Sequence, residues 1–201
     1  MNVLIVARTR MREGMRCIGG ITRKCQSLRL MTADGSYQSS SCPFHVGDVW
    51  ELQYRVMDTV RPPHVENVCV DMDNVRRLRR HSHLQRLLRN YATPCCGSID
   101  RLFRGLLQFT TNGSGYISHR TGVPDGSTAF WIPDRDLERT DDGKHYMYNR
   151  GKRLVYVGEP EPVPVLPAGT VVRVSLATWW KPPDSDLKEE RCYLQLSGWY
   201  T

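Results

Sequence analysis

Two stretches of this chain repeat one pattern of apolar and polar residues. Residues 47–56 (GDVWELQYRV) and residues 169–178 (GTVVRVSLAT) each begin with glycine and then alternate, and each is followed by a pair of prolines. Alternation with a period of two is typical of a β-strand with one buried face. A strand, a double-proline loop and a second strand, occurring twice, indicate two copies of one small β-unit.

The length of the chain and its other strand patterns fit this duplication. At 201 residues the chain has room for two small domains, each able to bury the core of a five-stranded barrel. Short apolar or alternating runs between turn residues predict strands at residues 2–9, 15–22, 27–32, 47–57 and 65–72 in the first half, and at 115–120, 128–132, 144–149, 152–158, 169–178 and 190–200 in the second. Helices do not alternate with these strands, which argues against a parallel α/β fold.

Between the two sets of strands the apolar period changes to that of a helix. From Asp73 onward the apolar positions follow helical spacing through Tyr91, and a second helix is expected after Ser98, a suitable N-cap. The apolar residues of the two helices are Val75, Leu78, Leu84, Leu87, Leu88, Ile99, Leu102, Phe103, Leu106 and Leu107. The predicted fold class is therefore mainly β: two small β-barrels, residues 1–72 and 109–201, joined by a basic helical connector, residues 73–108.

The positive charge of the chain is concentrated in that connector. The net charge is +7, and the segment 76–89 contains six arginines and no acidic residue. These are Arg76, Arg77, Arg79, Arg80, Arg86 and Arg89. A basic stretch of this kind favours an anionic partner such as nucleic acid, although a solvated helix face with no partner has the same pattern.

The cysteines and the hydropathy of the chain bear on its compartment. Seven cysteines, an odd number, follow no disulfide framework spacing, which favours free thiols in a reducing compartment. No apolar run reaches the length that crosses a bilayer, and the apolar segment 3–7 is too short for a signal peptide. We therefore expect a cytoplasmic protein with no membrane partner.

Residue patterns for catalysis and metal binding are incomplete in this chain. The runs His64-Val65-Glu66 and Pro94-Cys95-Cys96 are similar to the motif of zinc deaminases, but Ser98 stands where the second cysteine of Cys-x-x-Cys is needed. His81 and His83 are closer together than the paired ligands of zinc fingers. A phosphate-binding glycine loop and a nucleophile elbow are both missing from the sequence. We expect no catalytic residue, no metal and no cofactor. The alternative left open is an enzyme whose site is assembled from His64, Glu66 and His119.

Basic and aromatic residues at the ligand-binding positions of a small barrel predict a nucleic-acid site. Five-stranded oligonucleotide-binding (OB) barrels use strands 2 and 3 with the 1–2 and 4–5 loops. In the first unit these regions hold Arg8, Arg10, Arg12, Arg29, Arg61 and His64, and in the second Arg120, Trp131, Trp179, Trp180 and Lys181. Arginines pair with phosphates, and exposed tryptophans stack on bases. The alternative for Trp131, and for one of Trp179 and Trp180, is packing into the core, and the alternative for Arg29 is a solvent-facing position.

Several short motifs resemble those of one protein family. In the first half they are Ala7-Arg8-Thr9-Arg10-Met11, Cys17-Ile18-Gly19-Gly20, Leu28-Arg29-Leu30, Val46-Gly47-Asp48-Val49-Trp50 and Pro62-Pro63-His64-Val65-Glu66, and in the second half Leu102-Phe103-x-Gly105, Gly113-x-Gly115-Tyr116-Ile117 and Ser127-Thr128-x-Phe130-Trp131. Together they resemble the dual OB-containing domain family over nearly the whole chain. The resemblance implies two OB-like barrels of bacterial proteins that bind nucleic acid, often in anti-phage or other conflict systems, and it implies no catalytic residue. Asn67 departs from the family pattern, in which an acidic residue follows His-x-Glu.

Two functional hypotheses follow. The first is a non-enzymatic module, built from tandem OB-like barrels, that binds single-stranded or structured nucleic acid as part of a bacterial defence system. Its predicted contacts are the six arginines of residues 76–89 and the basic and aromatic barrel residues. The second is a protein-interaction or scaffold subunit of a larger effector complex, because OB-like barrels also dock proteins. The double-proline loops and the proline-rich stretch 158–167 are its candidate surfaces.

Overall fold

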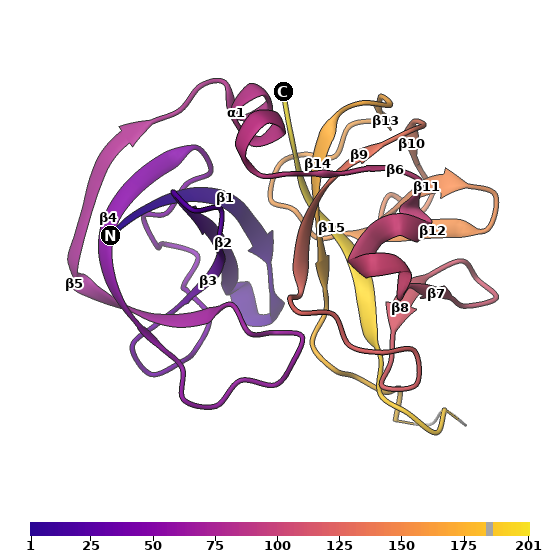
Figure 1. Cartoon of the computed structure of the whole chain (residues 1–201), viewed down its shortest axis with the longest axis horizontal. Helices are drawn as coiled ribbons and strands as arrows, with labels where there is room; N and C mark the ends of the chain where they lie inside the picture. The colour runs from indigo at the N-terminus through magenta and orange to yellow at the C-terminus, as the bar shows by residue number, and fades with distance from the viewer. Residues whose placement is uncertain (184–186) are drawn as a thin grey trace.

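The computed structural model describes residues 1–183 and 187–201 of the chain, which form two β-rich units lying side by side (Figure 1). In the first unit five strands close into a barrel in the order β1-β2-β3-β5-β4. They are β1 (Asn2–Arg10), β2 (Arg16–Thr22), β3 (Ser27–Met31), β4 (Asp48–Val56) and β5 (Asn67–Arg80), with the short 3-10 helix η1 (Arg12–Gly14) between β1 and β2. Strands β3 and β5 are parallel, and the other neighbouring strands are antiparallel. The prediction of a five-stranded first barrel is therefore confirmed.

Strand β1 is buried on both of its faces. Val3 and Ile5 lie in the core of the barrel, together with Leu52 of β4. The residues between them, Leu4 and Val6, belong to a separate apolar cluster on the other side of the strand. Because successive side chains of a strand point to opposite faces, the outer face of this barrel also needs apolar cover.

The second unit is a ten-stranded mixed sheet that hydrogen bonding does not close. Its strands are β6 (Cys95–Gly97), β7 (Gln108–Phe109), β8 (Gly115–Ile117), β9 (Thr128–Pro133), β10 (Leu137–Arg139), β11 (His145–Asn149), β12 (Lys152–Tyr156), β13 (Val165–Leu166), β14 (Val171–Leu176) and β15 (Cys192–Tyr200). Eight of them follow the order β13-β10-β11-β12-β15-β14-β9-β6. The prediction of a second closed barrel is therefore corrected to an open sheet. The ends of this path are β13 and β6, and the consecutive strands β9 and β10 are not paired with each other but are separated by a bend at residues 134 and 135.

The strand pairing of the two units supports the repeat. Strand β12 is parallel to β15, and β14 is antiparallel to β15 and β9. In the first barrel β3 is parallel to β5, and β4 is antiparallel to β5 and β1. Gly47 and Gly169, which precede β4 and β14, have φ angles of 95° and 81°, in the left-handed region that favours glycine. The two copies of the repeated pattern therefore occupy equivalent strands.

Part of the predicted helical connector is a strand. Residues 73–80 continue β5, residues 75–77, 79 and 80 pair with β4, and the α-helix α1 (Leu84–Tyr91) begins only after them. Two register shifts in the β4–β5 pairing mark bulges, and one of them leaves Leu78 without a partner on β4. A bulge inserts an extra residue into a strand, so the three-residue spacing of Val75 and Leu78 arises here without a helix. The prediction of a helix from residue 73 is therefore wrong.

The second predicted helix consists of tight turns. Ser98 caps the 3-10 helix η2 (Ile99–Gly105), because its hydroxyl oxygen accepts a hydrogen bond of 3.3 Å from the backbone N–H of Asp100. Phe103 and Arg104 have φ angles of 50° and 60°, which interrupt the helix. Of the five apolar residues expected in this helix, Ile99, Leu102, Phe103 and Leu107 are buried, and Leu106 is half-buried against the same core.

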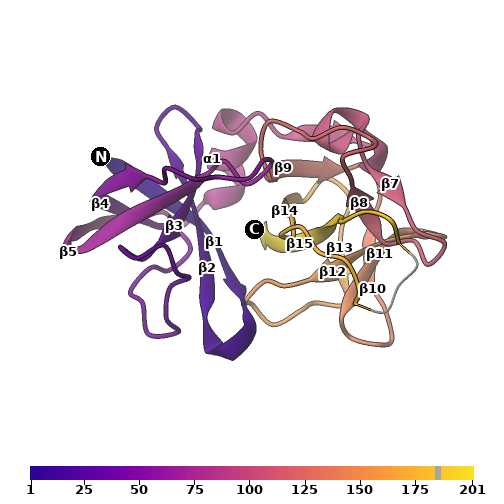
Figure 2. The same cartoon turned by 90° about the horizontal axis from the view of Figure 1, so that it is seen from below.

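The two units bury apolar side chains against each other next to α1. Leu4 and Val6 of β1 share one cluster with Val171 of β14, Tyr200 of β15 and the fully buried Leu88 of α1. The hydroxyl of Tyr200 also donates a hydrogen bond of 2.5 Å to the carbonyl oxygen of Val6. In Figure 1 and in the rotated view of Figure 2, α1 lies at the boundary between the units. The helix therefore helps to cover the outer face of the first barrel.

The state of the cysteines and the membrane-crossing capacity of the helices can be compared with the sequence-based expectations. All seven cysteines are free thiols. Burial raises the pKa of Cys192 to about 12. Among residues 1–183 and 187–201, none of the helices combines the length and the apolar character that a membrane crossing requires.

Candidate nucleic-acid interface

The predicted ligand face of the first barrel is buried against the second unit. Arg29 on β3 is only 8% exposed. It donates hydrogen bonds of 3.0 Å from Nη1 to Oδ1 of Asn67 and from Nη2 to Oγ of Ser127, which precedes β9. Glu66 accepts a hydrogen bond of 2.9 Å from the Ser127 hydroxyl and another from the Ser127 backbone N–H. Arg29 is therefore a structural residue of the junction, neither a ligand contact nor a solvent-facing side chain.

Arg8 and Arg10 of β1 both make contacts within the molecule, although Arg8 is buried and Arg10 is exposed. The guanidinium of Arg8 donates to backbone carbonyl oxygens within residues 40–44, and its Nε lies 2.8 Å from Oε2 of Glu159. Arg10 donates hydrogen bonds of 3.0 and 2.7 Å, from Nε and Nη2, to the carbonyl oxygen of Gly158. These contacts attach the loop that follows β12 to the first barrel. The prediction that Arg8 is a phosphate contact is corrected, because its side chain is buried.

The two double-proline loops contact each other at the junction. Nη2 of Arg61, in the first loop, lies 2.6 Å from Oε2 of Glu190, in the second. The same guanidinium lies 5.1 Å from the ring centroid of Trp179, on which the imidazole of His119 stacks at 4.3 Å. The indole Nε1 of Trp179 donates a hydrogen bond of 2.7 Å to the carbonyl oxygen of Pro62. Trp179 therefore joins the units, with protein groups packed on its ring.

His64 is buried beside this contact. Its Nε2 lies 3.2 Å from the carbonyl oxygen of Leu176 and 3.1 Å from that of Ala177, so we assign the ring proton to Nε2 as a donor. Burial, followed by the positive charge of Arg29, lowers the pKa of His64 below its ordinary value of 6.5. A buried neutral imidazole is a structural group, so the prediction that His64 contacts phosphate is corrected.

The remaining predicted residues of the barrel regions have different environments. Trp131 is fully buried and donates a hydrogen bond of 2.8 Å from Nε1 to the carbonyl oxygen of Gly97, which confirms the core alternative for this residue. Trp180 is 48% exposed, and its ring packs against Tyr193 with centroids 6.1 Å apart. The side chains of three further predicted contacts are exposed, namely Arg12, Arg120 and Lys181.

The six arginines of residues 76–89 form an exposed basic stretch along β5 and α1. We call it the basic strip; its members are Arg76, Arg77, Arg79, Arg80, Arg86 and Arg89. Nη2 of Arg76 lies 2.6 Å from Oε2 of Glu51, and Nη2 of Arg77 lies 2.9 Å from Oδ1 of Asp48. Arg79 has no ion pair within the described residues. Because the six arginines share two carboxylate partners among the described residues, Glu51 and Asp48, the strip keeps an excess of positive charge.

A groove of about 350 Å³ lies beside the basic strip, between the outer face of the first barrel and α1. We call it the α1 groove. Its apolar lining residues are Leu4, Ile21, Val49 and Leu87. They belong to the cluster that α1 and the second unit cover elsewhere, so the groove is an open part of that apolar face. The other lining residues are Asn2, Thr22, Arg23, Cys25, Arg79, His81 and Tyr91.

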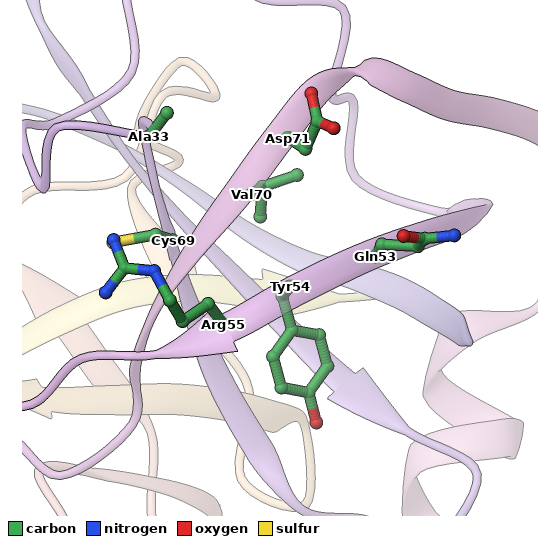
Figure 3. A pocket seen from close by; sticks show the side chains of 7 residues that line it. All are labelled: Ala33, Gln53, Tyr54, Arg55, Cys69, Val70 and Asp71. Atoms are coloured by element: carbon green, nitrogen blue, oxygen red, sulfur yellow. The ribbon is translucent and has the colours of Figure 1, made fainter.

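A second hollow, of about 270 Å³, lies on the β4–β5 hairpin (Figure 3). Its lining includes two directly paired couples, Tyr54 with Val70 and Arg55 with Cys69. Figure 3 shows the guanidinium of Arg55 beside Cys69, and the ring of Tyr54 pointing away from Asp71. One arginine and one aspartate give this hollow no excess of positive charge, so it suits an anionic ligand less well than the α1 groove does.

The residues considered for catalysis are held by structural contacts. Glu66 accepts hydrogen bonds from Ser127, His64 faces two backbone carbonyl oxygens, and His119 stacks on Trp179. In the part of the chain that the structure describes, no three His, Cys, Asp or Glu side chains are grouped as metal ligands.

Comparison with known protein families gives a match over nearly the whole chain. The family model described as "Dual OB-containing domain" matches residues 1–199. No curated protein and no solved structure matches the chain. The matched range includes both units, the basic strip and the α1 groove.

Proposed function

Since the chain belongs to the dual OB-containing domain family, we propose that it is a nucleic-acid-binding module whose basic strip contacts the phosphate backbone. OB folds commonly bind nucleic acid, and basic grooves track its backbone. The observation that carries the proposal is the run of six exposed arginines along β5 and α1, which pair with two carboxylates among residues 1–183 and 187–201.

The basic strip is long enough for several phosphate contacts. From Arg76 to Arg80, β5 covers about 13 Å, at roughly 3.3 Å per residue. The salt bridges to Glu51 and Asp48 restrict the side chains of Arg76 and Arg77, which lowers the conformational entropy that they lose on binding. A guanidinium has five N–H donors, so each of these arginines keeps donors for a phosphate.

The burial of the usual OB ligand face supports a site elsewhere on the molecule. Arg29 and His64 lie in the junction, and Arg61 is paired with Glu190. A ligand of the first barrel would therefore use its outer surface, where the basic strip lies.

We assign no reaction to the module. His64 and Glu66, the first candidates for acid–base chemistry, are occupied by contacts that hold the units together. In a bacterial defence system, the setting that the family resemblance implies, such a module would bring an effector to nucleic acid.

The test is the salt dependence of binding. Fluorescence anisotropy is measured with labelled single-stranded DNA, single-stranded RNA and duplex, from about 50 to about 200 mM salt. Four to six phosphate contacts would weaken binding by about 10²- to 10³-fold over this range, because each contact releases counterions. Failure to bind any of these ligands at low salt would contradict the proposal. A partner protein that co-purifies with the chain would then favour the alternative function, a scaffold subunit.

A further inference from the structure

The floor of the α1 groove is a flat row of apolar side chains on three neighbouring strands. Leu4 of β1 pairs directly with Ile21 of β2 on one side and with Val49 of β4 on the other. Neighbouring strands are about 4.8 Å apart, so this row spans about 10 Å, which is the scale of a nucleobase. Leu87 of α1 also lines the groove. Leu4, Ile21 and Val49 are 8%, 4% and 6% exposed, so the floor offers a narrow apolar contact, and the half-buried Leu87 widens the surface on which a flat ring can lie.

The rim of the groove is cationic. Arg23 follows β2 and Arg79 lies near the end of β5, and both side chains are exposed. Among the described residues that line the groove there is no carboxylate, and neither arginine has an ion pair within the described part of the chain. The rim therefore complements a group with negative charge.

An exposed aromatic ring stands at one end of the groove. Tyr91, the last residue of α1, is 68% exposed. The thiol of Cys25 donates a hydrogen bond of 2.6 Å to the carbonyl oxygen of Tyr91, which fixes the end of the helix against the turn after β2. The bond holds the backbone of Tyr91, and the exposed ring beside the groove can stack on a base.

We propose that the α1 groove binds one unpaired base of a single-stranded nucleic acid, with the adjacent phosphates on Arg23 and Arg79. The inference rests on the proposed function, because Arg79 belongs both to the groove and to the basic strip. A strand that follows the strip therefore passes the mouth of the groove. The volume of about 350 Å³ lies within the range of small-ligand pockets. A base inside a duplex is paired and stacked on both faces, so it cannot enter without being flipped out.

The proposal is tested by comparing single strands with a duplex of equal length. Anisotropy titrations at one salt concentration use the wild-type chain, Tyr91→Ala and Arg23→Ala, with single-stranded DNA, single-stranded RNA and duplex. The wild type is expected to prefer the single strands. Tyr91→Ala is expected to weaken single-strand binding by about 5- to 150-fold, the equivalent of 1–3 kcal/mol for one stacked base, and to leave duplex affinity unchanged. The affinities for single-stranded DNA and single-stranded RNA show which of the two sugars the protein prefers.

Two further measurements locate the effect. Val165→Ala truncates another exposed apolar side chain, one in the second unit that does not line the groove, and is expected to leave all affinities unchanged. Arg23→Ala is expected to reduce the slope of log affinity against log salt by about 0.7 for single strands, the value for one lost phosphate contact.

The outcomes separate this inference from the proposed function. If the wild type binds single strands and duplex equally, and Tyr91→Ala has no effect, the groove proposal is overturned while salt-dependent binding to the basic strip stands. If the chain binds no nucleic acid at low salt, the proposed function fails, and the groove proposal fails with it.

Discussion

The indole nitrogen of Trp179 donates a hydrogen bond of 2.7 Å to the carbonyl oxygen of Pro62. These two residues belong to the two copies of the repeated double-proline element, so the duplicated loops are used to bind the units to each other. In an OB barrel the corresponding 4–5 loop is available to a ligand. The contact therefore explains why the ligand site that we propose lies outside the predicted barrel face.

Replacing Trp179 tests the role of the loop contact. Trp179→Ala removes the hydrogen bond to Pro62 and the contacts of the ring with His119 and Arg61. We expect the free energy of unfolding, measured by urea denaturation, to fall by about 2 kcal/mol. Trp180→Ala, at an exposed neighbouring position, should change the free energy of unfolding little. Nucleic-acid affinity should be unchanged in Trp179→Ala; a strong loss of affinity without a loss of stability would return Trp179 to the ligand site.

The carboxylate of Glu66 links the first barrel to the second unit. Glu66→Gln should lower the free energy of unfolding by about 1.5–3 kcal/mol, because charge-assisted hydrogen bonds to Ser127 are weakened and the charge near the buried Arg29 is lost. Glu138→Gln makes the same change at an exposed position of β10 and should have little effect. Equal stability of the two variants in urea would show that the junction does not depend on this carboxylate.

His64 should make stability depend on pH below neutrality. Its folded-state pKa is lowered from 6.5 by burial and by Arg29, whereas Glu66 and the two backbone carbonyl groups act in the opposite direction. Above about pH 6.5 the imidazole is neutral in both states, and its contribution is fully present. As the pH falls below that value the unfolded chain takes up a proton more readily than the folded chain, so stability is lost at up to about 1.4 kcal/mol per pH unit.

The check on His64 is urea denaturation of the wild type and of His64→Gln at about pH 7.5 and about pH 5.5. The wild type should lose more stability between these two values than the variant does. The same loss in both proteins would mean that other groups control the acid sensitivity.

We expect stability to require glycine at position 19, because a side chain there would meet the buried Arg173. A Cβ atom at Gly19 would lie 2.8 Å from Nη2 and 3.0 Å from Cζ of Arg173, whose side chain is buried and bonded to Ser197. Gly19→Ala should therefore cost about 1–3 kcal/mol of stability through overpacking. Gly198→Ala is a matched control, because nothing lies within 4 Å of its added methyl group. Equal melting temperatures for the two variants would contradict this account.

Most strands could be predicted because their patterns are local. The interval 15–22 corresponds to β2 (Arg16–Thr22), and 144–149 to β11 (His145–Asn149). The helix predicted from Asp73 failed because pairing with β4 and two bulges decide the conformation of β5. Neither the pairing with β4 nor the bulges can be recognised from the local spacing of apolar residues, because a bulged strand loses its period of two.

The candidate site could be predicted only in part. A charge run is a property of the sequence itself, so the arginines of the basic strip were identifiable. Burial of Arg29 depends on how the second unit docks, and burial of Arg8 depends on the loop at residues 40–44 as well as on Glu159, and no local pattern shows either. Arg23 and Tyr91 were missed because the groove forms only when α1 packs beside the barrel. One signal was present: residues 3–7 are apolar at every position, which is typical of a strand covered on both faces.

The central claim, that the basic strip binds the phosphate backbone, is tested most directly by the salt dependence of single-strand affinity in two double variants. Arg76→Ala/Arg79→Ala removes two charges from the strip, and Arg139→Ala/Arg150→Ala removes two exposed charges from the second unit that belong to no predicted contact. We expect the slope of log affinity against log salt to become shallower by about 1.4 in the strip variant, from about 0.7 per phosphate contact, and to stay at the wild-type value in the control. Equal slopes for the two double variants would contradict the claim.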